Sequence, residues 1–179
     1  MNAAPIAVRL GRRMHIIQGE CQVSADPEVV LLTMLGSCVA ACICDPVAEV
    51  GGMNHFLLPD SDDHSDADSL RYGAYAMELL VNRLLTLGAR RGRLEAKLFG
   101  GASLTKGLTD VGTRNVAFAQ AYLRREGIQF QGGSTDGSHA RRLQYWPVSG
   151  RARQLVLSRI VDAQPILPAR DRDGTVEFF

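Results

Sequence analysis

Residues 29–46 have the sequence VVLLTMLGSCVAACICDP, and the architecture of the chain can be built outward from them. The first part, Val29–Leu32, is continuously apolar, as expected for a strand buried on both faces. Gly36–Ser37 ends that strand in a tight turn, since glycine adopts backbone conformations that other residues avoid. A second strand is expected from Cys38 to Cys44 and ends at Asp45–Pro46. The stretch therefore predicts two buried strands, with a thiol directly after the turn that joins them.

Further strands and two helices are expected around this pair. The expected strands are Met14–Val23, Val50–Leu58, Leu94–Phe99, Ile128–Gln131, Arg141–Tyr145 and Arg151–Leu157, the last two forming a hairpin through residues 147–150. A first helix is expected from Ser69, as its N-cap, to Gly88, because apolar residues recur at steps of three and four. A second helix is expected over Thr113–Glu126, and the polar stretch Ser61–Asp68 is expected to be a loop.

The order of these elements predicts an α+β fold. Mixed and antiparallel strands are expected to form a sheet sandwich, with the two main helices packed outside it. Residues 14–162 are expected to form a single domain between an N-terminal tail, residues 1–13, and a C-terminal tail, residues 163–179.

Composition limits the classes of function. The chain has 179 residues, 46% of them apolar, and 20 basic residues stand against 19 acidic ones. This balance gives no overall field to attract nucleic acid, and we expect no nucleic-acid partner. No apolar run is long enough to span or insert into a membrane, and no signal peptide is evident, so a cytoplasmic location with four reduced cysteines is expected.

The chemistry suggested by these residues centres on Cys38 and His55. A nucleophilic thiol needs a base and backbone amides that face the oxyanion, and the Gly36–Ser37 turn can leave such amides unpaired. If the segments on either side of Asp45–Pro46 pair, the thiol and the imidazole come within reach of each other. Spacing alone leaves the alternative open, because a cysteine or histidine among apolar residues is commonly a core residue.

A metal site is a further alternative that the cysteines raise. Cys38, Cys42 and Cys44 share one face of an extended strand. Their thiols would lie about 7 to 13 Å apart, which does not suit tetrahedral zinc. We therefore expect no metal and no cofactor.

Several motifs resemble those of one protein family. The most specific is LGSCVAACICDPVAEVGGMNHFLLP, residues 35–59, followed by KLFGGA (97–102), GTRNV (112–116), LRREGI (123–128) and ARRLQYWPVSG (140–150). Together they resemble the CheD family of chemoreceptor glutamine deamidases, over residues 14 to 158.

The resemblance implies roles for individual residues. Cys38 matches the nucleophile and His55 the base, and a threonine on the preceding strand is the third member. Thr33 is the candidate, although some relatives have one more residue before the Gly-Ser-Cys motif, which places Leu32 in the alternative register. Gly36, Ser37 and Asn54 are expected to support the site or its oxyanion, whereas Gly100 and Gly101 are expected to serve backbone geometry.

The resemblance also implies a reaction and partners. The Cys38 thiolate would attack a glutamine carboxamide of a methyl-accepting chemotaxis receptor, ammonia would leave, and water would hydrolyse the thioester to glutamate. The same path would serve a glutamyl methyl ester as a side activity. The alternative function is a non-catalytic chemotaxis adaptor that binds a CheC-type phosphatase, a partner that the resemblance also suggests for the enzyme.

Overall fold

The computed structural model describes residues 11–59, 66–103, 111–157 and 175–179. These residues form ten strands, two α-helices and one turn of 3-10 helix. In chain order, the elements are β1 (Arg12–His15), β2 (Cys21–Ser24), β3 (Val29–Leu35), β4 (Val39–Asp45), β5 (Val50–Asn54), α1 (Asp66–Thr86), η1 (Arg91–Arg93), β6 (Glu95–Gly100), α2 (Val111–Arg125), β7 (Gln129–Thr135), β8 (Arg141–Trp146), β9 (Arg151–Val156) and β10 (Thr175–Phe178).

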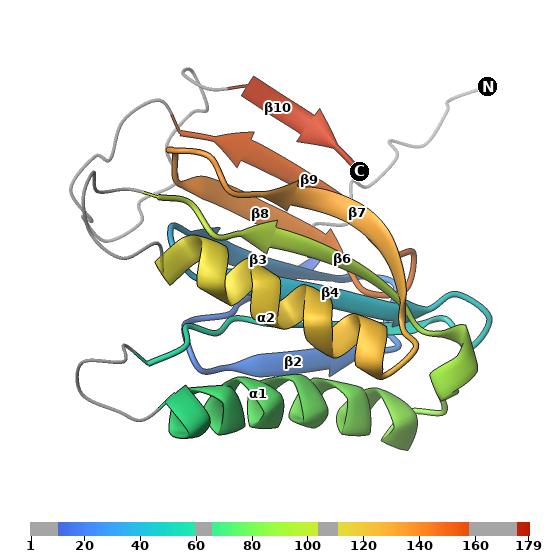
Figure 1. Ribbon diagram of the computed structural model, residues 1–179. Coiled ribbons are helices and arrows are strands. Elements are labelled where there is room, and N and C mark those ends of the chain that lie inside the picture. Colours follow the sequence, from blue (N-terminus) through green and yellow to red (C-terminus); the bar gives the residue numbers. More distant parts are fainter. Residues whose placement is uncertain (1–10, 60–65, 104–110, 158–174) are drawn as a thin grey trace, which may run out of the picture.

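The strands form two five-stranded sheets. The first sheet has the order β1-β3-β8-β9-β10, and the second has the order β2-β5-β4-β6-β7. Neighbouring strands are antiparallel except for the parallel pairs β1–β3 and β6–β7. Both helices pack on the second sheet, so the molecule has a layer of helices and two layers of strands (Figure 1). The expected α+β sandwich with two outer helices is confirmed.

Two hydrophobic cores hold these layers together. One lies between the second sheet and the helices, where α1 contributes Met77, Leu80, Val81 and Leu84. The other lies between the sheets and includes Leu31, Leu35, Met53 and Tyr145. Because successive strand residues face opposite sides, β4 sends Val39, Ala41 and Ile43 to the first core and Ala40 and Cys42 to the second. This strand is buried along its whole length.

Some expected elements were wrong in detail. The expected strand Met14–Val23 is two strands in different sheets, because a turn with Gly19 at φ +87° separates β1 from β2. Ser69 is not an N-cap; it lies inside α1, is buried, and donates its hydroxyl to the Pro59 carbonyl oxygen. The outer face of β3 is only partly covered, because Leu32 on it is buried but Met34 is 48% exposed.

The ends of the described chain also belong to the sheets. Arg12 opens β1, and β10 pairs antiparallel with β9 inside the segment expected to be a tail. Most of the loop expected at residues 61–68 lies outside the described residues, which resume at Asp66 with α1. No helix among the described residues is long and apolar enough to cross a membrane.

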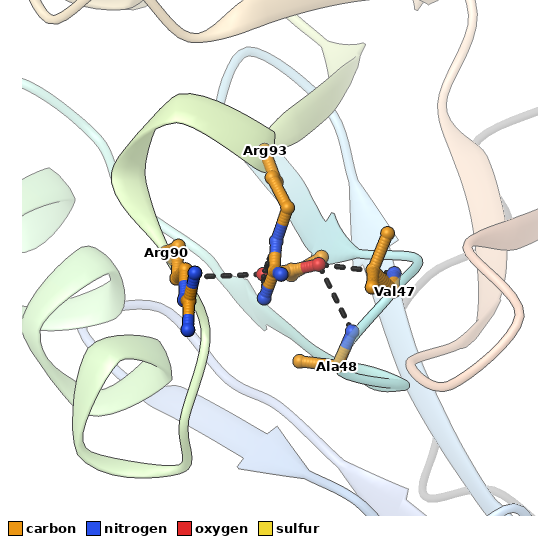
Figure 2. A network of polar contacts seen from close by, with 5 residues as sticks. Val47, Ala48, Arg90 and Arg93 are labelled. Atoms are coloured by element: carbon orange, nitrogen blue, oxygen red, sulfur yellow. Dashed lines mark hydrogen bonds and ion pairs between the residues drawn. The ribbon is translucent and has the colours of Figure 1, made fainter.

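A buried carboxylate fixes the end of β4 that lies farthest from Cys38. Asp45 accepts hydrogen bonds from the amides of Val47, Ala48 and Arg90 and an ion pair from Arg93, with Nη2 2.7 Å from Oδ2 (Figure 2). Burial alone would raise its pKa, but these donors outweigh burial and lower the pKa to about 2. The carboxylate therefore anchors the turn after β4 and the η1 segment to the second sheet.

Candidate active site

Cys38 lies in the turn between β3 and β4, at the edge of the core between the two sheets. It is half-buried, whereas the other three cysteines are buried. Its carbonyl oxygen accepts the Gly101 amide at 2.8 Å. A Cβ on Gly100, whose φ is +106°, would lie 2.1 Å from that oxygen, so Gly100 must be glycine for the backbone to approach Cys38. The expected structural role of Gly100 and Gly101 is confirmed.

The rest of the turn is held by α2 and by the segment after β6. Asn115, which has no exposed surface, donates its side-chain amide to the Ser37 carbonyl at 2.9 Å and accepts the Leu58 amide at 2.9 Å. The Gly36 carbonyl accepts the Ala102 amide at 2.8 Å. Asn115 therefore joins the turn before the thiol to the segment after His55. In the sequence, this residue is identified only as part of the motif GTRNV.

Main-chain pairing places His55 on the same face as the thiol. Val39 and Phe56 exchange two hydrogen bonds of 2.9 Å, which continues the β4–β5 pairing beyond β5. In this register His55 lies opposite Ala40, and Cys38 is its diagonal neighbour, a relation that puts side chains within reach of each other. The expected pairing of these two segments is confirmed.

Thr33 orients the imidazole across the gap between the sheets. Its hydroxyl lies 2.8 Å from His55 Nδ1 and donates to the Ile16 carbonyl oxygen at 2.7 Å. A hydroxyl has a single proton, so the oxygen must accept from Nδ1–H, and we infer that Nδ1 holds the ring proton. His55 Nε2 is then a bare lone pair, and it is buried without a hydrogen-bond partner among the described residues.

The alternative register for the third residue is excluded by strand alternation. Thr33 and Leu31 face the core between the sheets, whereas Leu32 faces the opposite side of β3. The structure therefore brings Thr33, and not Leu32, to His55.

Burial keeps both candidate catalytic groups neutral at rest. Burial raises the pKa of the Cys38 thiol, although its own backbone amide partly opposes this effect. Burial likewise lowers the pKa of His55, an effect that the nearby Ile16 carbonyl partly opposes. The lowered thiol pKa expected for an activated cysteine is absent, so the resting site holds a thiol and a neutral imidazole.

The turn at the thiol carries the backbone amides of Ser37 and Cys38, and the Cys38 amide interacts with its own thiol. Within the described part of the chain, no other residue accepts a hydrogen bond from the amides of Ser37 and Cys38. Asn54 lies on the other face: its side chain accepts the Ala41 amide and donates to the Ala76 carbonyl, both at 3.0 Å. Asn54 therefore supports the strands from the helix side, and its amide is not available to an oxyanion.

The thiol has one further neighbour that sequence reasoning missed. Cys38 Sγ donates to the side-chain oxygen of Gln18, at 3.6 Å, from the turn between β1 and β2. Nothing in the local pattern around residue 18 indicates this contact, because the two residues are twenty positions apart.

The cysteines of β4 do not assemble a metal site. The described residues contain no group of three or more His, Cys, Asp or Glu side chains able to hold a metal ion. Cys42 is fully enclosed in the core, where burial raises the pKa of its thiol well above the ordinary value.

Comparison with known proteins agrees with the motifs. The family model described as CheD chemotactic sensory transduction matches residues 57–154, more than half of the chain. Proteins named "Probable chemoreceptor glutamine deamidase CheD" are similar over nearly the whole length. The one from Acidiphilium cryptum is 57% identical and covers 94% of both chains; the one from Caulobacter vibrioides is 60% identical over 86% of this chain and 81% of its own.

A relative of the same name from Rhizobium meliloti is 53% identical over 94% of this chain and 97% of its own. A solved structure from Neisseria meningitidis, assigned to the DUF152 family, is 12% identical and covers 66% of this chain and 53% of its own, with a TM-score of 0.43. By the family match and by these close relatives, this chain belongs to the CheD family.

Proposed function

We propose that this chain is a protein-glutamine deamidase that converts glutamines of chemoreceptors to glutamate. The observation that supports this most directly is the Thr33–His55 hydrogen bond, which leaves Nε2 as an unpartnered lone pair on the face where Cys38 lies. A buried imidazole nitrogen without a partner is costly, and such atoms persist where chemistry uses them. An adaptor that only binds a CheC-type phosphatase has no need of one.

The reaction begins when a glutamine carboxamide enters beside Cys38. His55 Nε2 takes the thiol proton as the sulfur attacks the carboxamide carbon, which gives a tetrahedral oxyanion. In this proposal the donors to the oxyanion are the backbone amides of Ser37 and Cys38. Each such donor is typically worth about 3 kcal/mol in the transition state.

Collapse of the intermediate releases ammonia. The imidazolium returns its proton to the leaving nitrogen, the C–N bond breaks, and a thioester between Cys38 and the substrate remains. Neutral His55 then removes a proton from water, which attacks the thioester and yields glutamate and the free thiol. Proton delivery limits this path, because an amide nitrogen leaves poorly without a proton.

The neutral resting pair suits this order of events. Transfer from thiol to imidazole during attack places on Nε2 the proton that the departing nitrogen needs. Methoxide is a better leaving group than amide, so a glutamyl methyl ester is a further substrate within the same proposal.

The proposal includes the setting of the reaction. The enzyme acts in the cytoplasm, where thiols stay reduced, on the exposed helical part of a receptor. A CheC-type phosphatase is an additional partner of the same proposal, and no cofactor enters any step.

The test measures ammonia release from a cytoplasmic receptor fragment, with mass spectrometry to locate each amide converted to an acid. Cys38→Ala is expected to abolish release. Cys44→Ala is the matched control, because Cys44 lies on the same strand, at the end away from the site. Equal release by wild type and Cys38→Ala would exclude the proposed function.

A further inference from the structure

We infer that Gln18 is an internal competitor of the substrate: its carboxamide occupies the place beside the Cys38 thiol that a substrate glutamine must enter. The inference rests on the proposed function and adds a residue that controls access to the nucleophile. It begins from the chemical identity of the two groups, since Gln18 presents to the sulfur the functional group that the enzyme is proposed to hydrolyse.

The contact occupies the nucleophile. The 3.6 Å hydrogen bond to Gln18 Oε1 is the only side-chain hydrogen bond that Cys38 makes to a described residue. In it the thiol donates its proton to Gln18. The acceptor that the reaction requires, His55 Nε2, has no partner at the same time. The resting site therefore directs the thiol proton to the competitor and leaves the base unused.

The backbone under Gln18 is fixed to the base itself. Gly19 donates its amide to the His55 carbonyl at 2.7 Å, and His55 donates its own amide to the Glu20 carbonyl at 3.0 Å. The Glu20 carboxylate accepts the Ile17 amide at 3.0 Å, which closes the turn. These three hydrogen bonds hold the turn, in which Gly19 has a φ of +87°, and they keep the backbone at Gln18 next to His55.

The side chain of Gln18 can nevertheless leave. It is exposed, and its contact to sulfur is a single weak hydrogen bond. An entering carboxamide can displace it without moving the turn. The thiol then loses its acceptor on the outside and turns to His55, so substrate entry and thiol activation become the same event.

Competition of this kind has a defined kinetic signature. The apparent affinity for substrate is reduced by the fraction of molecules in which Gln18 covers the thiol. Removal of this single weak hydrogen bond in Gln18→Ala is therefore expected to lower KM for the receptor fragment by about two- to threefold, with kcat unchanged. Gln129→Ala, an exposed glutamine at the start of β7, is the matched control and is expected to behave as wild type.

A second readout needs neither receptor nor amide hydrolysis. Iodoacetamide bears a carboxamide and alkylates thiols, and Cys38 is the one cysteine of the four that is not buried. Alkylation of Cys38 is expected to be about two- to tenfold faster in Gln18→Ala, because the acceptor that stabilises the protonated thiol is gone. Gln18→Met keeps the length of the side chain without a carboxamide, so it separates the hydrogen bond from simple cover.

The outcomes are distinct. Faster alkylation and a lower KM in both Gln18 variants support the competitor. A wild-type alkylation rate and a wild-type KM in Gln18→Ala, or a fall in kcat, would overturn the inference. Deamidation of the receptor fragment by the wild-type protein would in that case still support the proposed function. If alkylation of Cys38 were faster in Gln18→Ala but not in Gln18→Met, the effect would come from the size of the side chain. This result would also refute competition by the carboxamide. No ammonia release by wild type would overturn the proposed function and, with it, this inference.

Discussion

Substitution of Thr33 by valine tests how the base is held. Valine has the shape of threonine without the hydroxyl, so the change removes the acceptor of His55 Nδ1–H and the donor to the Ile16 carbonyl while filling the same space. The imidazole then loses the contact that fixes both its orientation and its tautomer. We expect kcat for ammonia release to fall and KM to change little, because Thr33 does not contact the thiol or the entering carboxamide.

The size of the effect follows from the burial of this contact. Leaving a buried donor without its partner costs about 1 to 3 kcal/mol, which corresponds to about 5- to 150-fold in rate if the whole cost falls on the transition state. Valine frees the Ile16 carbonyl, which already acts on the pKa of the ring, so Nδ1–H can turn to that carbonyl and retain part of the orientation. The expected loss is therefore in the lower part of this range, about tenfold.

The assay compares Thr33→Val with Thr33→Ser at saturating receptor fragment. Serine restores the hydroxyl without the methyl group, and it is expected to recover most of kcat. Urea unfolding of both variants measures any loss of stability, which separates misorientation of the base from partial unfolding. A valine variant with wild-type kcat would show that Thr33 does not position His55. The hydrogen bond from Nδ1–H of His55 to the Thr33 hydroxyl would then have no effect on catalysis.

Two further predictions concern the backbone of the site and the far end of β4. Gly100→Ala is expected to unfold the turn around Cys38 or abolish ammonia release, because its Cβ would overlap the Cys38 carbonyl at a positive φ; Gly92→Ala, with open space around it, is expected to leave activity and melting temperature unchanged. Wild-type activity in Gly100→Ala would refute this geometry. Asp45→Asn is expected to lower the free energy of unfolding at pH 7 by about 1 to 2 kcal/mol, because the folded pKa of about 2 lies below the ordinary value of 3.8. The stabilisation is full above about pH 4 and is lost as the pH falls towards 2, so urea unfolding across this range should show a weaker pH dependence in Asp45→Asn than in wild type.

Much of the fold could be predicted because local patterns determine it. The apolar run of β3, the stop at Gly36–Ser37 and the periodic apolar face of α2 all depend on residues close in sequence. On α2 this apolar face includes Val116, Ala119 and Tyr122, all of which are buried. The break between β1 and β2 was missed although Gln18, Gly19 and Glu20 interrupt the apolar residues there, and Gly19 takes a φ of +87° in the turn.

The site was harder to predict because its contacts join distant residues. Cys38 and His55 could be paired in advance, since their strands are neighbours along the chain. Asn115 reaches Ser37 across 78 positions and Gln18 reaches Cys38 across twenty, and no local periodicity encodes either contact. The choice between Leu32 and Thr33 depended on which face of β3 meets the second sheet. One residue of register reverses that face, so the arrangement of the sheets had to be known first.

The position of the base links catalysis to the packing of the two sheets. Thr33 belongs to the first sheet and His55 continues the second, so the hydrogen bond between them spans the core that Leu31, Leu35 and Met53 fill. A packed core of this density transmits small shifts instead of absorbing them. A displacement of one sheet by a fraction of an ångström would therefore lengthen this hydrogen bond while most of the apolar contacts persist. In the proposed mechanism the direction of the Nε2 lone pair therefore depends on the inter-sheet core, because Thr33 and His55 come from different sheets.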